Sequence, residues 1–248
     1  MTLAGPRTPS YSELVSAVRR EGEAMVAAAR TGADAEVPTC GEWTITDLAK
    51  HVWQVYANVT LYVSTRAAER PEKFPEMPLG DPIELLASQL DDLVAALTNC
   101  AADTPVWSWV SNAPEGAIFW ARRMAHESAV HRFDAQNAHG IRQPIDAELA
   151  VDGIDELLDV IVPRVYGRDE ITGPEGTVSL RATDGDAWLL ELDADGVRHN
   201  DQVKTPDVTA TGTSSALLLA LYSRVPWTSL DVTGDAALLT RWTDVLNF

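Results

Sequence analysis

The stretch TITDLAKHVWQVYANVTLYVSTRAAE, residues 44–69, decides how the first half of the chain folds. Asp47 follows Thr44 by three residues, which is the spacing of a capping box, in which two side chains satisfy the free backbone N–H groups at a helix start. Apolar residues then recur every three or four positions, as they do along one face of an α-helix. We therefore predict a long amphipathic helix that begins at Ile45 and ends before the proline-rich segment that follows.

Three other segments of the first half show the same helical pattern. They are residues 10–32, with Ser10 or Ser12 as the N-cap and Gly32 as the stop, residues 83–101, and residues 117–137. Loops of short or medium length, rich in proline and glycine, join them. Four helices with such connections favour an antiparallel four-helix bundle.

The second half of the chain combines strand-like and helical sequence patterns. Short strand-like segments occupy residues 176–183, 187–193, 196–200 and 206–213, and helical segments occupy residues 147–165, 214–225 and 235–246. Runs such as DGD and DADG separate the strands as turns. The predicted fold class is therefore α+β, with the bundle in residues 8–150 and a smaller α+β domain in residues 151–248.

Composition narrows the range of partners. The chain has 248 residues, of which 46% are hydrophobic, so it can bury a sizeable core. Its 19 basic and 37 acidic residues give a net charge of -18, which repels phosphate backbones and anionic lipid, so we expect no nucleic-acid or membrane partner. The chain shows neither a secretory signal pattern nor an apolar stretch near the roughly 20 residues of a membrane span, which favours a cytoplasmic protein.

The candidate metal ligands lie on two of the expected helices. Glu127 and His131 are four residues apart, so on a helix they share one face and can reach one cation. A third ligand is needed, and His51, next to the apolar stripe of residues 44–69, is expected to face the bundle interior. The alternative is that these are ordinary hydrogen-bonded side chains, because a Glu and a His at this spacing often occur by chance.

Several neighbouring residues allow two interpretations each. His126 points about 100° away from Glu127 in helical projection and is expected to flank the site or face solvent. Asp134 either orients a ligand imidazole or is an exposed helix charge. The remaining candidates are Trp43, Trp53 and Trp120, as pocket walls or core residues, His139 and His199, as surface residues, and Cys40 and Cys100, as buried or unreactive thiols.

Four strings in this order resemble one family along nearly the whole chain. They are EWTITDLAKHV, RRMAHESAVHRFDAQNAHG, IDAELAVDGIDELL and LYSRVPWTSLDVTGDAALLTRW. Together they are similar to the mycothiol-dependent maleylpyruvate isomerase family. The resemblance implies a DinB-like four-helix bundle followed by an α+β domain similar to sterol-carrier modules.

The resemblance also implies a set of site residues. In the family, a His of the second helix and a Glu and a His four apart in the fourth helix hold a divalent metal, usually zinc, and here these are His51, Glu127 and His131. A functionally important arginine of the C-terminal domain matches Arg224, which would be the catalytic and cofactor-binding residue and would pair with a carboxylate of the thiol or substrate. Ser223 precedes it, where the family often has glycine.

The function implied is that of a cytoplasmic enzyme of actinobacterial type. Three protein ligands leave one metal position open, and a thiol bound there would be held as the nucleophilic thiolate. We therefore expect mycothiol as cosubstrate and a small electrophile as substrate, with S-transfer favoured over cis-trans isomerisation, in a monomer or homodimer. The alternatives are a non-catalytic ligand-binding or regulatory protein of the same fold and a metal-dependent hydrolase.

Overall fold

The chain forms two compact units in a computed structural model that describes residues 8–110, 116–168, 171–200 and 202–246. One unit is Pro9–Gln143 and the other is mainly Pro144–Phe248. Helices make up the first, and helices with a sheet make up the second, so the predicted α+β class is confirmed. The placement of the domain boundary after residue 150 stays a prediction.

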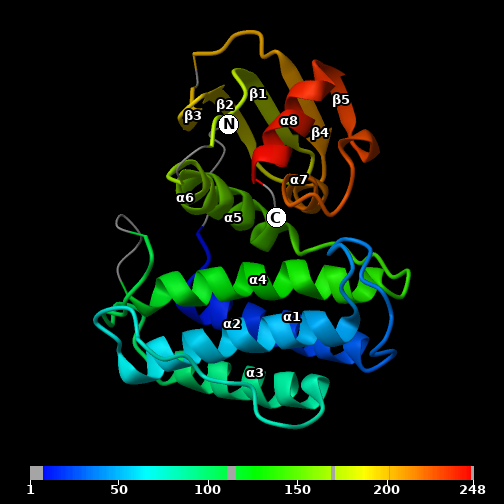
Figure 1. Cartoon of the computed structure of the whole chain (residues 1–248). Coiled ribbons are helices and arrows are strands. Elements are labelled where there is room, and N and C mark those ends of the chain that lie inside the picture. The colour runs from blue at the N-terminus through cyan, green and yellow to red at the C-terminus, as the bar shows by residue number, and fades with distance from the viewer. Residues whose placement is uncertain (1–7, 111–115, 169–170, 201, 247–248) are drawn as a thin grey trace. The chain divides into compact units, whose positions relative to one another are not determined.

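The first unit is the predicted four-helix bundle. Its helices are α1 (Tyr11–Ala29), α2 (Ile45–Thr65), α3 (Pro82–Thr98) and α4 (Ala117–Asn137). Figure 1 shows α1 and α4 running in one direction and α2 and α3 in the other, with a long connection between α2 and α3. Among the described residues, no helix has both the length and the apolar character of a membrane span.

Capping boxes begin the first two helices: the sequence predicts the box at Thr44, and for the first helix it predicts only Ser10 or Ser12 as the N-cap. Ser10 pairs with Glu13 at the start of α1, and Thr44 pairs with Asp47 at the start of α2. Each box satisfies backbone N–H groups that a helix start leaves free. The box at Thr44 places the histidine of α2 in the second turn of that helix.

The second unit begins with a helix that contains a π turn. The sequence predicts one helix over residues 147–165, and the structure has α5 (Ala147–Glu156), the π turn Leu157–Ile161 and α6 (Val162–Tyr166). The N–H of Val162 donates to the carbonyl of Leu157, five residues back. Pro163 lacks an N–H and would clash with a carbonyl in a regular helix, and the wider turn relieves that clash.

Among the described residues, five strands form one sheet. They are β1 (Gly176–Ala182), β2 (Ala187–Asp193), β3 (Gly196–His199), β4 (Val208–Gly212) and β5 (Asp231–Gly234), in the order β3-β2-β1-β4-β5. The β1–β4 pair is parallel and the other pairs are antiparallel. The sequence predicts the first four strands. It misses β5, which is only four residues long and lacks an alternating pattern.

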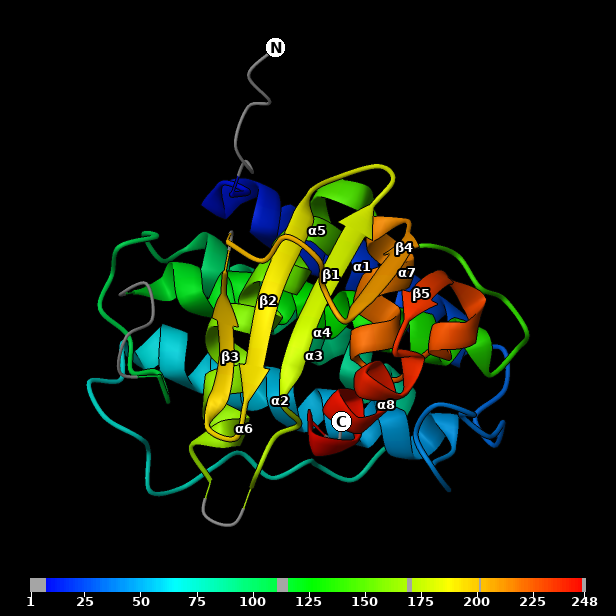
Figure 2. The ribbon, with the colours of Figure 1, turned by 90° about the horizontal axis from the view of Figure 1, so that it is seen from above.

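The sheet buries one face against helices of its own unit. Val178, Leu180, Trp188, Leu190, Val208 and Ala210 are all buried, and the strand registers place them on the same face. The indole Nε1 of Trp188 donates to Asp155 of α5 at 2.7 Å. Figure 2 shows α5 and α7 (Ser214–Leu221) behind the sheet, and α8 (Ala236–Leu246) ends the described chain.

Candidate metal centre

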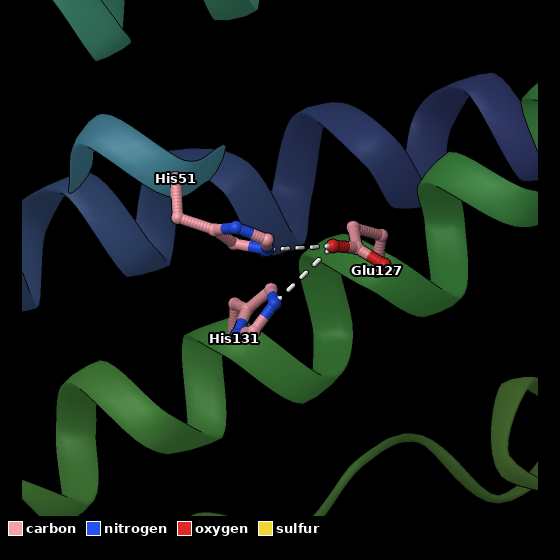
Figure 3. A group of neighbouring side chains, drawn as sticks. All are labelled: His51, Glu127 and His131. Atoms are coloured by element: carbon pink, nitrogen blue, oxygen red, sulfur yellow. Dashed lines mark ion pairs between the residues drawn. The ribbon is translucent and has the colours of Figure 1, made fainter. Parts of the chain in front are cut away.

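His51, Glu127 and His131 come together in the bundle. His51 projects from α2, and Glu127 and His131 project from successive turns of α4 toward it, as Figure 3 shows. One ligand-capable atom from each residue lies within 4.8 Å of those from the other two. Because α2 and α4 run in opposite directions, an early residue of α2 meets a late turn of α4. The structure therefore assembles the trio that spacing nominates in the sequence.

The distances within this cluster suit a small cation. Glu127 Oε1 lies 3.2 Å from Nε2 of His131 and 3.6 Å from Nε2 of His51. A zinc ion held tetrahedrally at about 2.0–2.2 Å from each ligand needs ligand atoms roughly 3.3–3.6 Å apart. Two imidazole nitrogens and one carboxylate oxygen are also a donor set that zinc accepts. The two separations from Glu127 and the chemistry of the three donors therefore fit such an ion.

Asp134 fixes the orientation of the His131 ring. Its Oδ2 lies 2.8 Å from Nδ1 of His131, and the Asp134 side chain is completely buried, so its interpretation as an exposed helix charge is wrong. A contact at Nδ1 leaves Nε2 directed at Glu127. Burial lowers the pKa of His131, but the hydrogen bonds that its ring donates to Asp134 and Glu127 outweigh burial and raise that pKa to about 9.

Arg123 holds the second oxygen of Glu127. Its guanidinium lies 3.2 Å from Oε2 of Glu127, one helical turn away, and only 8% of the Arg123 side chain is exposed. Burial raises the pKa of Glu127, but contacts with His131 and His51 and the charge of Arg123 hold it well below its usual range. The carboxylate is therefore ionised, with Oε1 turned toward the histidines.

His51 lies at the open side of the cluster. Its side chain is 39% exposed, against 9% for His131, although its ring points at Glu127 as predicted for an inward-facing residue. The ring of Trp43 packs beside it with centroids 5.1 Å apart. Trp53 and Trp120 are instead buried in the core, where the ring of Trp120 packs against that of Tyr62.

The remaining histidines lie outside the cluster. His126 is fully buried in α4. The expectation that it faces solvent is therefore wrong, and the alternative that it flanks the site stays a prediction. His199 is 52% exposed in β3, as expected for a surface residue, and His139 is half-buried in the loop after α4.

Two residues of the α1–α2 connection contact Asp134, which no sequence pattern predicts. Thr39 Oγ1 donates to Asp134 Oδ1 at 2.6 Å, and Cys40 Sγ lies 3.6 Å from Asp134 Oδ2. Cys40 is half-buried, whereas Cys100 is buried as predicted. The contacts span about 95 residues and follow no spacing rule. Only the tertiary structure brings them to the site.

Arg224 belongs to the second compact unit, just after α7. Its backbone N–H donates to the carbonyl of Leu219, and its guanidinium donates to the carbonyl of Tyr222 at 2.9 Å. Ser223 before it has a φ of 60°, the left-handed conformation that glycine adopts most easily. The glycine that the family often has there fits this helix end, and Ser223 takes the same conformation.

Two family models match the chain. The model of the mycothiol maleylpyruvate isomerase N-terminal domain matches residues 15–136, and that of the MDMPI C-terminal domain matches residues 148–241. None of the curated proteins compared with the chain matches it.

Among solved structures, the crystal structure of the mycothiol-dependent maleylpyruvate isomerase is similar. It has a TM-score of 0.63 at 12% sequence identity, and the match covers 91% of this chain and 93% of that chain. A histidine-to-alanine mutant of that isomerase gives a TM-score of 0.62 at 13% identity over the same shares. Structural similarity at such low sequence identity shows that the two proteins share a fold.

Proposed function

The chain belongs to the mycothiol maleylpyruvate isomerase family, and from this membership we propose that it is a metal-dependent enzyme that activates the thiol mycothiol. The reaction would be S-transfer to a small electrophile, or cis-trans isomerisation of one. The observation that carries the proposal is the cluster of His51, Glu127 and His131, with two of its members held by buried polar partners.

The metal would be a divalent cation, with zinc the ion that the donor set favours. When bound, it would stabilise the thiol as its thiolate, the form that attacks electrophiles. His51, Glu127 and His131 would supply three ligand atoms, and three protein ligands leave a fourth position for another molecule. The exposed side of His51 supports access to the cluster from that direction.

The other polar residues would keep the ligands in place. Asp134 would hold the proton on Nδ1 of His131, which keeps Nε2 free to act as a ligand. Arg123 would hold Oε2 of Glu127 and balance its negative charge. Arg224 would pair with a carboxylate of the thiol or of the substrate, because its planar fork of donors matches a carboxylate.

Two thiol-dependent reactions are compatible with the proposed site: S-transfer, which the sequence analysis favours, and cis-trans isomerisation, which the family's description names. In an isomerisation, the thiolate would add to a conjugated double bond, rotation about the new single bond would follow, and the thiol would leave. In a transfer, it would displace a leaving group or open an epoxide and remain on the product. The metal cluster accounts for thiol activation in both, and no residue described here selects the electrophile.

Calorimetric titration of the zinc-loaded protein with mycothiol tests the proposal, together with a conjugation assay on a generic electrophile. We expect the thiol to bind and turnover to require it. His51→Ala should lose both bound metal and turnover, whereas His199→Ala, at an exposed histidine outside the cluster, should lose neither.

Other outcomes would favour the other functions. Bound zinc without thiol affinity would indicate a ligand-binding or regulatory protein, and hydrolysis without thiol would indicate a hydrolase. Full thiol-dependent turnover in metal-free His51→Ala would reject metal dependence.

A further inference from the structure

The connection between α1 and α2 folds into a short hairpin, residues 33–46. The N–H of Val37 donates to the carbonyl of Trp43, and that of Ile45 donates to the carbonyl of Ala35, at 2.8 and 2.9 Å. Gly41 turns the chain with a φ of 65°. The tip of this α1–α2 hairpin therefore has a defined backbone, and it carries Thr39.

Thr39 reaches from this tip to a carboxylate of α4. Its hydroxyl donates to Oδ1 of Asp134 at 2.6 Å, while Oδ2 of Asp134 contacts Nδ1 of His131 at 2.8 Å. Asp134 is completely buried, so an oxygen that lost its partner would stay away from water. The two contacts lie on opposite oxygens of one carboxylate.

Contacts on both oxygens restrict the carboxylate more than a contact on one. The terminal torsion of an aspartate is broad, and one partner leaves the plane of the carboxylate free to rotate about that contact. The hydrogen bond from the Thr39 hydroxyl to Oδ1 restricts this rotation. The Sγ of Cys40, 3.6 Å from Oδ2, is a longer and weaker contact and does not replace it.

We propose that Thr39 is a positioning residue of the metal centre, whose hydroxyl fixes Asp134 and, through it, the ring of His131. The proposal rests on the proposed function, in which His131 is a metal ligand. Partners that orient a ligand from outside typically contribute 10- to 100-fold to metal affinity. The conformation of the α1–α2 hairpin would thereby affect the metal affinity of a site whose ligands lie on α2 and α4.

A merely structural role for Thr39 predicts a different result. If the hydroxyl only anchored the hairpin to α4, its loss would destabilise the metal-free and metal-loaded proteins equally. The affinity for the metal would then stay unchanged, because it depends on the difference between those two states. Metal affinity, measured beside the stability of the metal-free protein, therefore separates the two roles.

The test compares Thr39→Val, which removes the hydroxyl at similar size, with Thr39→Ser, which keeps it. Thr31→Val is the matched control, because Thr31 lies in the same connection and its hydroxyl donates only to the backbone carbonyl of Ala28 among the contacts described. Zinc affinity is measured by competition with a chromophoric chelator, and ligand geometry by the visible spectrum of the Co²⁺-loaded protein.

We expect zinc affinity to fall about 10- to 100-fold in Thr39→Val, with an altered Co²⁺ spectrum. Thr39→Ser and Thr31→Val should keep an affinity near that of the wild type. If Thr39→Val does not fold, Thr39→Ala gives the same readouts.

Unchanged zinc affinity in the folded Thr39 variants would overturn the inference and leave the proposed function standing. A wild-type protein that binds no divalent ion would overturn both. The two failures are therefore distinguishable.

Discussion

The bundle and the C-terminal unit hold their candidate functional residues in different ways. In the bundle, His131 and Glu127 are tied to buried side chains, Asp134 and Arg123, within α4 itself. In the C-terminal unit, Arg224 follows a helix end, where the backbone makes the defining hydrogen bonds. Side-chain networks therefore organise the bundle site, whereas backbone geometry organises the surroundings of Arg224.

This difference predicts how each region responds to mutation. A buried network transmits the loss of one partner to the others, because each polar group left behind stays away from water. Arg224 is only half-buried, and the side-chain hydrogen bond described for it is to a backbone carbonyl, that of Tyr222. Mutations in the bundle site should therefore affect stability and metal binding together, and mutation of Arg224 should affect catalysis with little effect on either.

The largest expected effect is that of His131→Ala. It removes a proposed ligand and also one partner of the buried Asp134 carboxylate. We expect metal binding to be lost and the metal-free protein to be destabilised by about 2–3 kcal/mol, measured by urea unfolding. His51→Ala should also lose the metal but cost the metal-free protein less than about 1 kcal/mol, since His51 is 39% exposed. Equal destabilisation by both variants would contradict the argument.

Arg224→Ala tests the other region. A charge-assisted hydrogen bond to a substrate carboxylate contributes about 1.5–3 kcal/mol, so we expect kcat/KM to fall roughly 10- to 100-fold. Zinc content and unfolding free energy should stay near those of the wild type. Arg241→Ala is the control, because Arg241 is 53% exposed in the same unit and pairs with Asp235. Loss of bound zinc in Arg224→Ala would contradict the proposed division of roles.

Metal binding should depend on pH through His131. Its pKa is raised to about 9 in the metal-free protein, so below that pH the ring carries a proton that must leave before the nitrogen can act as a ligand. We expect zinc affinity to rise with pH, by about tenfold per unit from this group, until pH approaches 9. The measurement is calorimetry at pH 7 and 8 in buffers of different ionisation enthalpy, which also reports the released proton. An affinity that is equal at both pH values would show that His131 is not the competing group.

The bundle and the three residues of the candidate metal cluster could be predicted from the sequence because their signals are local. A cap serine for α1, a capping box for α2 and a period of 3.6 residues place these helices, and Glu127 and His131 share a face as soon as α4 is a helix. His51 follows from its place beside an apolar stripe. These inferences need only one element at a time.

What the sequence did not show depends on contacts between distant segments. Thr39 meets Asp134 across 95 residues, and no spacing pattern marks such a contact. The strand β5 has four residues and is defined by pairing with β4 rather than by its own pattern. The π turn depends on Pro163, which a sequence pattern marks as a break but not as a widened turn.

The smallest expected effect concerns Ser223, in the backbone-organised region. Its φ of 60° is unfavourable for a residue with a side chain, and glycine removes that cost. The greater entropy of glycine in the unfolded chain offsets part of this gain in stability. We expect Ser223→Gly to stabilise the protein by about 0.5–1 kcal/mol, measured by urea unfolding. Ser16→Gly is the matched control in the bundle, since Ser16 is exposed within α1, where glycine is unfavourable and should destabilise by about 0.5 kcal/mol. Destabilisation by Ser223→Gly would show that the serine side chain, rather than the left-handed backbone, stabilises the segment before Arg224.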